Sequence, residues 1–238
     1  MERIIGHRGA AGYAPENTLA AFEKARALGC HFIEFDVMLS ADGEAFVFHD
    51  ENIKRTTNGR GEFGMLTAEY LRSLDTGYWY AKKFRGEKIV TFQEAITWLN
   101  ASGLHANIEI KPYPGRTEVT TIAVLTQINR YWPQDKKLPL LSSFDTDALT
   151  LCHSIAPEIP RGLLLDKWQE NWQKLAHELQ CVSVHLSRRA ATKARVLALK
   201  EQGYLVYVYT VNWKRKAAKL FSWGVDAVFT DYPDLLRK

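Results

Sequence analysis

Short apolar runs alternate along the chain with stretches whose apolar residues recur three and four positions apart. The short runs predict strands and the longer stretches predict helices, because each periodicity matches one backbone geometry. The predicted strands span 3–6, 32–38, 45–48, 107–110, 138–141, 162–165, 182–185, 205–209 and 227–229. The predicted helices span 18–28, 92–100, 118–131, 145–154, 190–202 and 214–223. Helix N-caps are expected at Asn17, Thr91 and Asp145 or Thr146.

Strands that alternate with helices indicate a parallel sheet with helices packed on it, an α/β fold. Repetition of this unit over 238 residues is the size of an eight-stranded (β/α)8 TIM barrel, and a doubly wound open sheet is the competing fold. We interpret residues 1–238 as a single domain. Nine predicted strands are one more than this barrel holds, so one of them is expected to lie outside the eight barrel strands.

The link between the predicted strands 32–38 and 45–48 explains the surplus strand. Residues 39–44 leave no room for a crossover helix, whereas the pair Asp42-Gly43 is typical of a two-residue hairpin turn. Such a turn would set Asp36 directly opposite His49, with Glu34 on the same sheet face. We therefore predict that the second barrel strand folds back at the rim.

The alternation of helix and strand stops between about residues 51 and 88, where glycines mix with aromatic residues. We predict a small insertion after the second strand, placed over the barrel mouth, because loops of this length usually carry function or some structure. A lid or substrate wall and a simple cap of the barrel are the two alternatives for its role.

Charged side chains interrupt two predicted strands with a period of two. Glu34 and Asp36 alternate with apolar residues in one strand, and Glu109 and Lys111 do so in another. Alternate side chains share a face, so both polar sets are expected inside the barrel near its carboxyl end, where barrel active sites lie. Three converging carboxylates without a nearby thiol favour one hard divalent cation, Mg²⁺ or Ca²⁺. The alternative is an interior network of ion pairs with Lys111 and Arg8.

Two histidines lie at strand ends, His7 together with Arg8 after the first strand and His49 after the third. Histidine exchanges protons near neutral pH, so the pair suggests a general base and a general acid, although such histidines often serve only as structural hydrogen-bonding residues. Arg8 offers a bidentate fork to phosphate oxygens, and Lys111 offers a point charge. Together with a cation, these groups fit phosphoryl transfer.

Composition narrows the classes of protein. The 31 Lys and Arg and 27 Asp and Glu give a net charge of +4 without a long run of one sign, so a nucleic-acid partner is not indicated. Three widely spaced cysteines argue against a disulfide framework or a Cys-rich zinc site. The pattern shows no signal peptide and no run of about 18 apolar residues, so we expect a cytoplasmic protein without a membrane anchor. The oligomeric state stays open, a homo-oligomer included.

Several motifs resemble those of the glycerophosphodiester phosphodiesterase family, in the family's order and over essentially the whole chain. They lie at residues 7–9, 14–18, 33–37, 48–50, 55–59, 107–112, 142–144, 209–212 and 230–231. The compact form resembles the cytosolic bacterial members. The resemblance implies a TIM barrel with an insertion after the second strand, and hydrolysis of glycerophosphodiesters such as glycerophosphocholine or glycerophosphoethanolamine to sn-glycerol 3-phosphate and an alcohol.

The resemblance also implies roles for single residues. These are an acid–base pair, His7 and His49; three metal ligands, Glu34, Asp36 and Glu109; and two phosphate contacts, Arg8 and Lys111. Phe144 and Trp213 match positions near the family's barrel mouth and are equally suited to packing. Two rival functions remain, a phospholipase of the C or D type that acts on lysolipids and a non-catalytic barrel that binds phosphodiesters.

Overall fold

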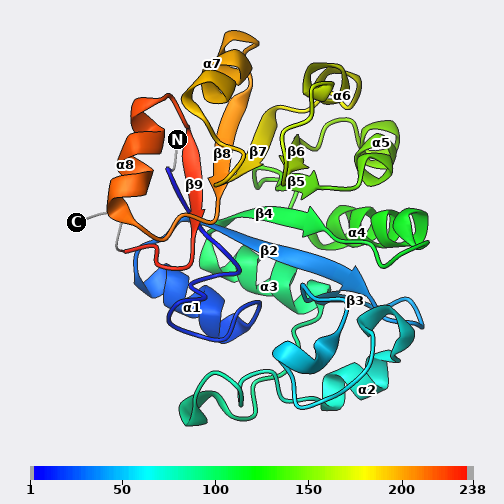
Figure 1. Ribbon diagram of the computed structural model, residues 1–238. Helices are drawn as coiled ribbons and strands as arrows, with labels where there is room; N and C mark the ends of the chain where they lie inside the picture. The colour runs from blue at the N-terminus through cyan, green and yellow to red at the C-terminus, as the bar shows by residue number, and fades with distance from the viewer. Residues whose placement is uncertain (1–2, 235–238) are drawn as a thin grey trace.

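The computed structural model describes residues 3–234, which form a parallel barrel surrounded by helices (Figure 1). The barrel strands are β1 (Ile4–Gly6), β2 (Phe32–Leu39), β4 (His105–Ile110), β5 (Leu140–Ser143), β6 (Arg161–Leu165), β7 (Ser183–Ser187), β8 (Leu205–Tyr209) and β9 (Ala227–Thr230). The crossover helices are α1 (Leu19–Ala27), α3 (Phe92–Ser102), α4 (Thr117–Tyr131), α5 (Thr146–Ile155), α6 (Trp172–Glu178), α7 (Lys193–Glu201) and α8 (Lys214–Ser222). β1 pairs with β9 on one side and β2 on the other, so the sheet closes. The predicted TIM barrel is confirmed.

The ninth strand, β3 (Ala45–Val47), runs antiparallel along the far end of β2. β2 is 8 residues long and pairs with β1 at Ile33, near its beginning. Farther along the same edge β3 takes over, with Val37 opposite Val47. The second barrel strand therefore extends past the rim and folds back, as predicted.

The turn between β2 and β3 differs from the two-residue turn that Asp42-Gly43 predicts. Ser40 and Glu44 close the hairpin through the Ser40 N–H and the Glu44 carbonyl at 2.9 Å, so the loop holds the three residues 41–43. The Asp42 carboxylate accepts from the Ser40 hydroxyl at 2.6 Å and from the Ala68 N–H at 3.0 Å, which ties the loop to the inserted segment. These bonds favour the longer loop over the two-residue turn.

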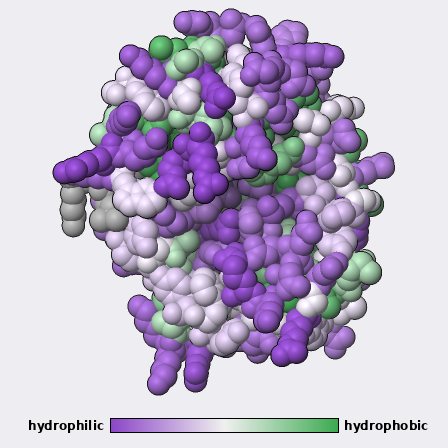
Figure 2. All heavy atoms as spheres, in the orientation of Figure 1, coloured by the Kyte–Doolittle hydropathy of each residue, from purple (hydrophilic) through white to green (hydrophobic). Residues whose placement is uncertain are grey.

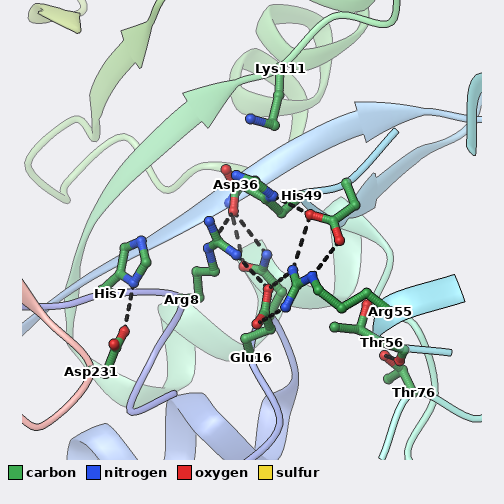
Figure 3. Close-up of polar contacts among 12 residues, drawn as sticks. His7, Arg8, Glu16, Asp36, His49, Arg55, Thr56, Thr76, Lys111 and Asp231 are labelled. Carbon is green, nitrogen blue, oxygen red and sulfur yellow. Dashed lines mark hydrogen bonds and ion pairs between the residues drawn. The ribbon is translucent and has the colours of Figure 1, made fainter. Parts of the chain in front are cut away.

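The longer loop shifts the register by one residue. Asp36 lies across from Phe48, whose N–H donates to the Asp36 carbonyl at 3.1 Å. The predicted direct pairing of Asp36 with His49 is therefore wrong. His49 follows β3 and still lies beside Asp36, in the close-up of Figure 3.

Residues 51–88 form the inserted segment between β3 and α3, and Figure 1 shows it beside the ends of β2 and β3. It contains α2 (Ala68–Ser73) and the short 3₁₀ turns η1 (Ile53–Arg55), η2 (Phe63–Met65) and η3 (Lys82–Phe84). An apolar cluster joins it to the hairpin, where Phe48 and Phe63 stack with ring centroids 4.8 Å apart. The single-domain interpretation stays a prediction, and residues 1–2 and 235–238 of that range lie outside the described residues.

The barrel interior changes from apolar to polar along its axis. Toward the amino ends of the strands it is filled by apolar side chains, namely Ile5, Leu140, Tyr207, Ala227 and Phe229. On β2 the apolar Ile33, Phe35 and Val37 face outward and pack with residues of the surrounding helices. The intervening Glu34 and Asp36 therefore face inward near the carboxyl end, as their alternation predicts. Within residues 3–234, no helix has the length and apolarity to cross a membrane.

Candidate active site

Three carboxylates meet inside the barrel where β2 and β4 end. Asp36 is the register partner of Glu109 across these strands, and Glu34 lies two residues earlier on the same face. One oxygen of each carboxylate lies within 4.8 Å of those of the other two. Strand register therefore brings together the three residues that the sequence predicts as metal ligands.

The three carboxylates affect one another because they are buried together. Burial, followed by the charges of Asp36 and Glu109, raises the pKa of Glu34 well above its usual range. Burial and the charge of Asp36 raise the pKa of Glu109 to about 7. Burial opposes ionisation of Asp36 too, yet the positive charge of Arg8 holds the pKa of Asp36 below its usual value. The three carboxylates therefore outnumber the two cationic side chains beside them, those of Arg8 and Lys111.

Arg8 reaches these carboxylates from a tight turn after β1, with its backbone in the left-handed region at φ 50°. The Arg8 N–H donates to Glu34 Oε2 at 2.9 Å, and the guanidinium Nε lies 3.4 Å from Asp36 Oδ2. The next residue must be glycine, because a Cβ at Gly9 would lie 2.7 Å from the backbone of Ala21 in α1. The turn therefore packs directly on α1 while it presents Arg8 to the carboxylates.

Asn17 binds a carboxylate and does not cap the first helix. Its Nδ2 donates to Asp36 Oδ2 at 2.9 Å. The N-cap of α1 is Thr18, whose hydroxyl accepts from the Ala21 N–H at 3.2 Å. The predicted cap at Asn17 is wrong, because its left-handed backbone, at φ 58°, is not the extended conformation of an N-cap residue.

Each of the two predicted catalytic histidines contacts a carboxylate through Nδ1. His7 Nδ1 lies 2.7 Å from Asp231 Oδ1, and His49 Nδ1 lies 2.5 Å from Asp50 Oδ1. Burial opposes ionisation of both carboxyls, but the hydrogen bonds from the histidines help to hold the pKa of Asp231 and of Asp50 below the usual range. An ionised carboxylate only accepts, so each Nδ1 carries a proton. The Nε2 atom of each histidine is then the one available for proton transfer.

A second arginine, Arg55 of the inserted segment, lies between Glu16 and Asp50 (Figure 3). It donates to Asp50 and to Glu16, and Glu16 also accepts from Arg8. Sequence reasoning assigned no role to Glu16, Asp50, Arg55 or Asp231. An aspartate directly after a strand-end histidine could have identified Asp50. Glu16 and Arg55 belong to the family motifs at residues 14–18 and 55–59, but nothing in the sequence indicates that these two residues, 39 positions apart, pair with each other.

A cavity of about 640 Å³ opens beside the histidine at the end of β3. It is lined by His49, Asp50, Glu51, Asn52, Lys54, Arg55 and Lys111. Lys111 Nζ lies 3.6 Å from Glu109 Oε1, so this lysine joins the cavity to the carboxylates. In the same orientation as Figure 1, the middle of the surface is hollowed and mainly hydrophilic (Figure 2).

The two aromatic residues predicted near the mouth are both exposed. Phe144 directly follows β5, and its ring lies edge-on to Tyr209 with centroids 6.0 Å apart. Trp213 directly precedes α8, and the Arg188 guanidinium lies 4.6 Å from its ring centroid. These contacts are with loop and strand-end residues, so a substrate role for Phe144 and Trp213 stays a prediction.

A parallel barrel with its ionisable side chains gathered at the carboxyl ends of the strands has the organisation of TIM-barrel enzymes. Comparison with known families narrows this class. The model of the glycerophosphoryl diester phosphodiesterase family matches residues 7–235, and the chain belongs to that family. The resemblance that the sequence motifs indicate, and the enzyme class that it implies, are confirmed.

Similar proteins cover nearly the whole chain. A glycerophosphodiester phosphodiesterase of Caldanaerobacter subterraneus is 34% identical, over 98% of this chain and 95% of the relative. One of Bacillus subtilis is 33% identical, over 98% of this chain and 85% of the relative. The structure of an Oleispira antarctica phosphodiesterase, in complex with the product sn-glycerol-3-phosphate, is similar at 37% identity and a TM-score of 0.96, over 100% of this chain and 96% of that one.

Proposed function

We propose that this chain hydrolyses glycerophosphodiesters to sn-glycerol 3-phosphate and an alcohol, with one bound divalent cation. The observation that carries the proposal is the pair of carboxylate-bound histidines beside three converging carboxylates, in a chain of this family. The product bound by the O. antarctica relative supports the glycerol half of the substrate. Glycerophosphocholine and glycerophosphoethanolamine are the proposed substrates.

The donor set of Glu34, Asp36 and Glu109 fits a hard cation. All three donors are carboxylate oxygens, which Mg²⁺ and Ca²⁺ prefer. Burial and mutual repulsion raise the pKa values of two of the three carboxyls, so their ionised forms are unfavourable in the folded protein. A bound cation would offset this repulsion. When bound, Mg²⁺ or Ca²⁺ would withdraw charge from the phosphoryl oxygens.

The chain's own side chains account for phosphate binding and proton movement. Arg8 lies beside the three carboxylates, where its guanidinium is paired with Glu16 and Asp36, and it supplies positive charge for a phosphate group. Lys111 supplies a second positive charge. One histidine, neutral with a free Nε2, takes a proton from water, or from the glycerol 2-hydroxyl to form a cyclic phosphate that water then opens. The other, protonated on both nitrogens, gives the Nε2 proton to the departing alcohol oxygen.

The cavity next to His49 is suited to the alcohol part of the substrate. Its lining side chains all carry polar or charged groups, Glu51 and Lys54 among them, which can bind a small hydrophilic alcohol. The proposal therefore favours water-soluble diesters over lysolipids.

A substrate panel tests the proposed function. Purified protein is stripped with a chelator and then supplied with Mg²⁺, Ca²⁺ or buffer, and release of sn-glycerol 3-phosphate is measured enzymatically. We expect turnover of glycerophosphocholine and glycerophosphoethanolamine that is lost on chelation and restored by one of the cations. Faster turnover of micellar lysophosphatidylcholine would favour the phospholipase alternative. Binding of the diesters without turnover would favour a non-catalytic barrel.

A further inference from the structure

The Arg55 guanidinium forms two forked ion pairs at once. Toward Glu16 it donates from Nη1 and Nη2, at 2.7 and 2.6 Å. Toward Asp50 it donates from Nε and Nη2, at 2.5 and 3.0 Å. These four contacts use the planar donor geometry that only arginine offers among the side chains.

Both carboxylates that Arg55 binds hold a group of the proposed active site. Glu16 Oε1 also accepts from Arg8 Nη1 at 2.5 Å, and Asp50 Oδ1 is the atom 2.5 Å from His49 Nδ1. The five side chains form a continuous series of hydrogen bonds and ion pairs from the proposed phosphate-binding arginine to a proposed proton-transfer histidine (Figure 3). Arg55 is the central member.

Glu16 is a fixed link in this series. Its side chain is only 13% exposed, so it bears a cost of desolvation. Burial opposes ionisation of Glu16, but the hydrogen bond from Arg55 and the charge of Arg8 hold its pKa below the usual value. One carboxylate shared by two guanidinium groups fixes their relative positions.

The inserted segment holds the backbone of Arg55 on both sides. Ile53, in the same 3₁₀ turn η1, is fully buried in the apolar cluster of the hairpin. The next residue, Thr56, accepts at its carbonyl from the Thr76 hydroxyl at 2.8 Å (Figure 3). The Arg55 side chain therefore extends from a supported turn toward the barrel.

From this geometry we propose that Arg55 is a positioning residue, through which the inserted segment fixes His49 and Arg8 relative to each other. It acts on His49 by orienting Asp50 and on Arg8 by orienting Glu16. The catalytic meaning of this role rests on the proposed function, whereas the effect on the His49 ring does not. The insertion is then part of the catalytic apparatus, beyond a simple cap.

The kinetic test replaces Arg55 and asks whether its group can be supplied from solution. We expect Arg55→Ala to lower kcat for glycerophosphocholine about 10²-fold, the cost typical of a misplaced catalytic group, with a smaller change in KM. Added guanidinium ion should restore part of the lost kcat at concentrations that leave the fold intact, whereas equal NaCl should not. Arg55→Lys should remain impaired, because one ammonium cannot fork to two carboxylates.

Arg60→Ala is the matched control. Arg60 is an exposed arginine of the same inserted segment, without a side-chain ion pair to the described residues. Arg60→Ala should have the kcat of the wild type, and added guanidinium ion should affect the two proteins equally. Where Arg55→Ala does not fold, Glu16→Gln breaks the same series from the other side, and its kcat should fall as well. Wild-type kcat in either folded variant would overturn the proposal, and so would a loss of kcat in Arg55→Ala that guanidinium leaves unchanged.

A second measurement separates this proposal from the proposed function. The ¹⁵N spectrum of histidine-labelled protein at alkaline pH reports the tautomer of His49, assigned by the signal lost in His49→Gln. We expect one Nδ1–H tautomer in the wild type and a mixture in Arg55→Ala. An unchanged tautomer would contradict the positioning role even in an active enzyme. A changed tautomer in a protein that hydrolyses no glycerophosphodiester would reject the proposed function and retain the positioning role.

Discussion

A histidine that donates from Nδ1 to a carboxylate has one nitrogen left for chemistry, and both His7 and His49 are in this state. We therefore predict that His7→Ala and His49→Ala each lower kcat by about 10²–10⁴-fold, the usual worth of acid–base catalysis. The readout is release of sn-glycerol 3-phosphate at saturating cation. His177→Ala, at an exposed position of α6, is the control and should keep wild-type turnover. Near-normal turnover in both active-site variants would refute the assignment.

His185 is a different kind of histidine, because it is enclosed in the barrel. Its Nε2 lies 2.9 Å from the Ser183 hydroxyl, and its ring stacks on Tyr207 with centroids 4.9 Å apart. A Cβ at Gly162 would lie 2.6 Å from the same Nε2, so only glycine leaves room for the ring. Burial lowers the pKa of His185 to about 3. The folded protein therefore holds this ring neutral.

This depressed pKa predicts a loss of stability in acid. The unfolded chain binds a proton at His185 below about pH 6.5, and the folded chain does so only near pH 3. Stability from the neutral ring is complete above pH 6.5 and falls as the pH drops through this window, by about 1.4 kcal/mol per unit. In urea unfolding, the wild type should lose about 2 kcal/mol more than His185→Gln between pH 6.5 and 5. Parallel pH profiles for the two proteins would contradict this.

At the scale of elements, the sequence predicts strands better than their register. All nine predicted strands form, and the alternation of Glu34 and Asp36 gives their inward face correctly. The hairpin register was not predicted correctly, because one of the bonds that favour the longer loop is donated to Asp42 by the N–H of Ala68, 26 residues away. The helices α2 and α6 were missed since they have only 6 and 7 residues, too few for a clear apolar period.

The same limit applies to the site. The site residues on strands or directly after them were predicted from alternation and family motifs. The structure brings all seven together at one end of the barrel, namely His7, Arg8, Glu34, Asp36, His49, Glu109 and Lys111. The groups that hold them, Glu16 and Arg55 above all, lie in loops whose partners are set only by the folded chain. Loop residues have no periodic pattern from which their contact partners could be predicted.

At the scale of the whole molecule, a bound cation should stabilise the fold. It would neutralise buried carboxylates on β2 and β4, which repel one another without it. At a hundredfold excess over Kd, Mg²⁺ or Ca²⁺ should add about 2.7 kcal/mol. For a chain of this size that corresponds to a rise in Tm of roughly 5–10 °C. Thermal unfolding with cation or with chelator measures the difference.

Two variants make this test specific. Glu109→Gln removes one proposed ligand and should abolish the difference in Tm between cation and chelator. Glu69→Gln, at an exposed position of α2, should keep the full difference. An equal response of the wild type and Glu109→Gln would show that the cation acts elsewhere on the protein.

The closure of the barrel by β1 and β9 has a consequence for how the enzyme comes into being. His7 depends on Asp231, 224 positions later, and the His7 N–H donates to the Thr230 carbonyl at 2.9 Å. Once the ribosome has made residues 1–110, β2 and β4 with all three carboxylates are present, yet His7 still lacks its partner. On the proposed mechanism, the chain therefore completes its pair of carboxylate-bound histidines only when β9 has emerged.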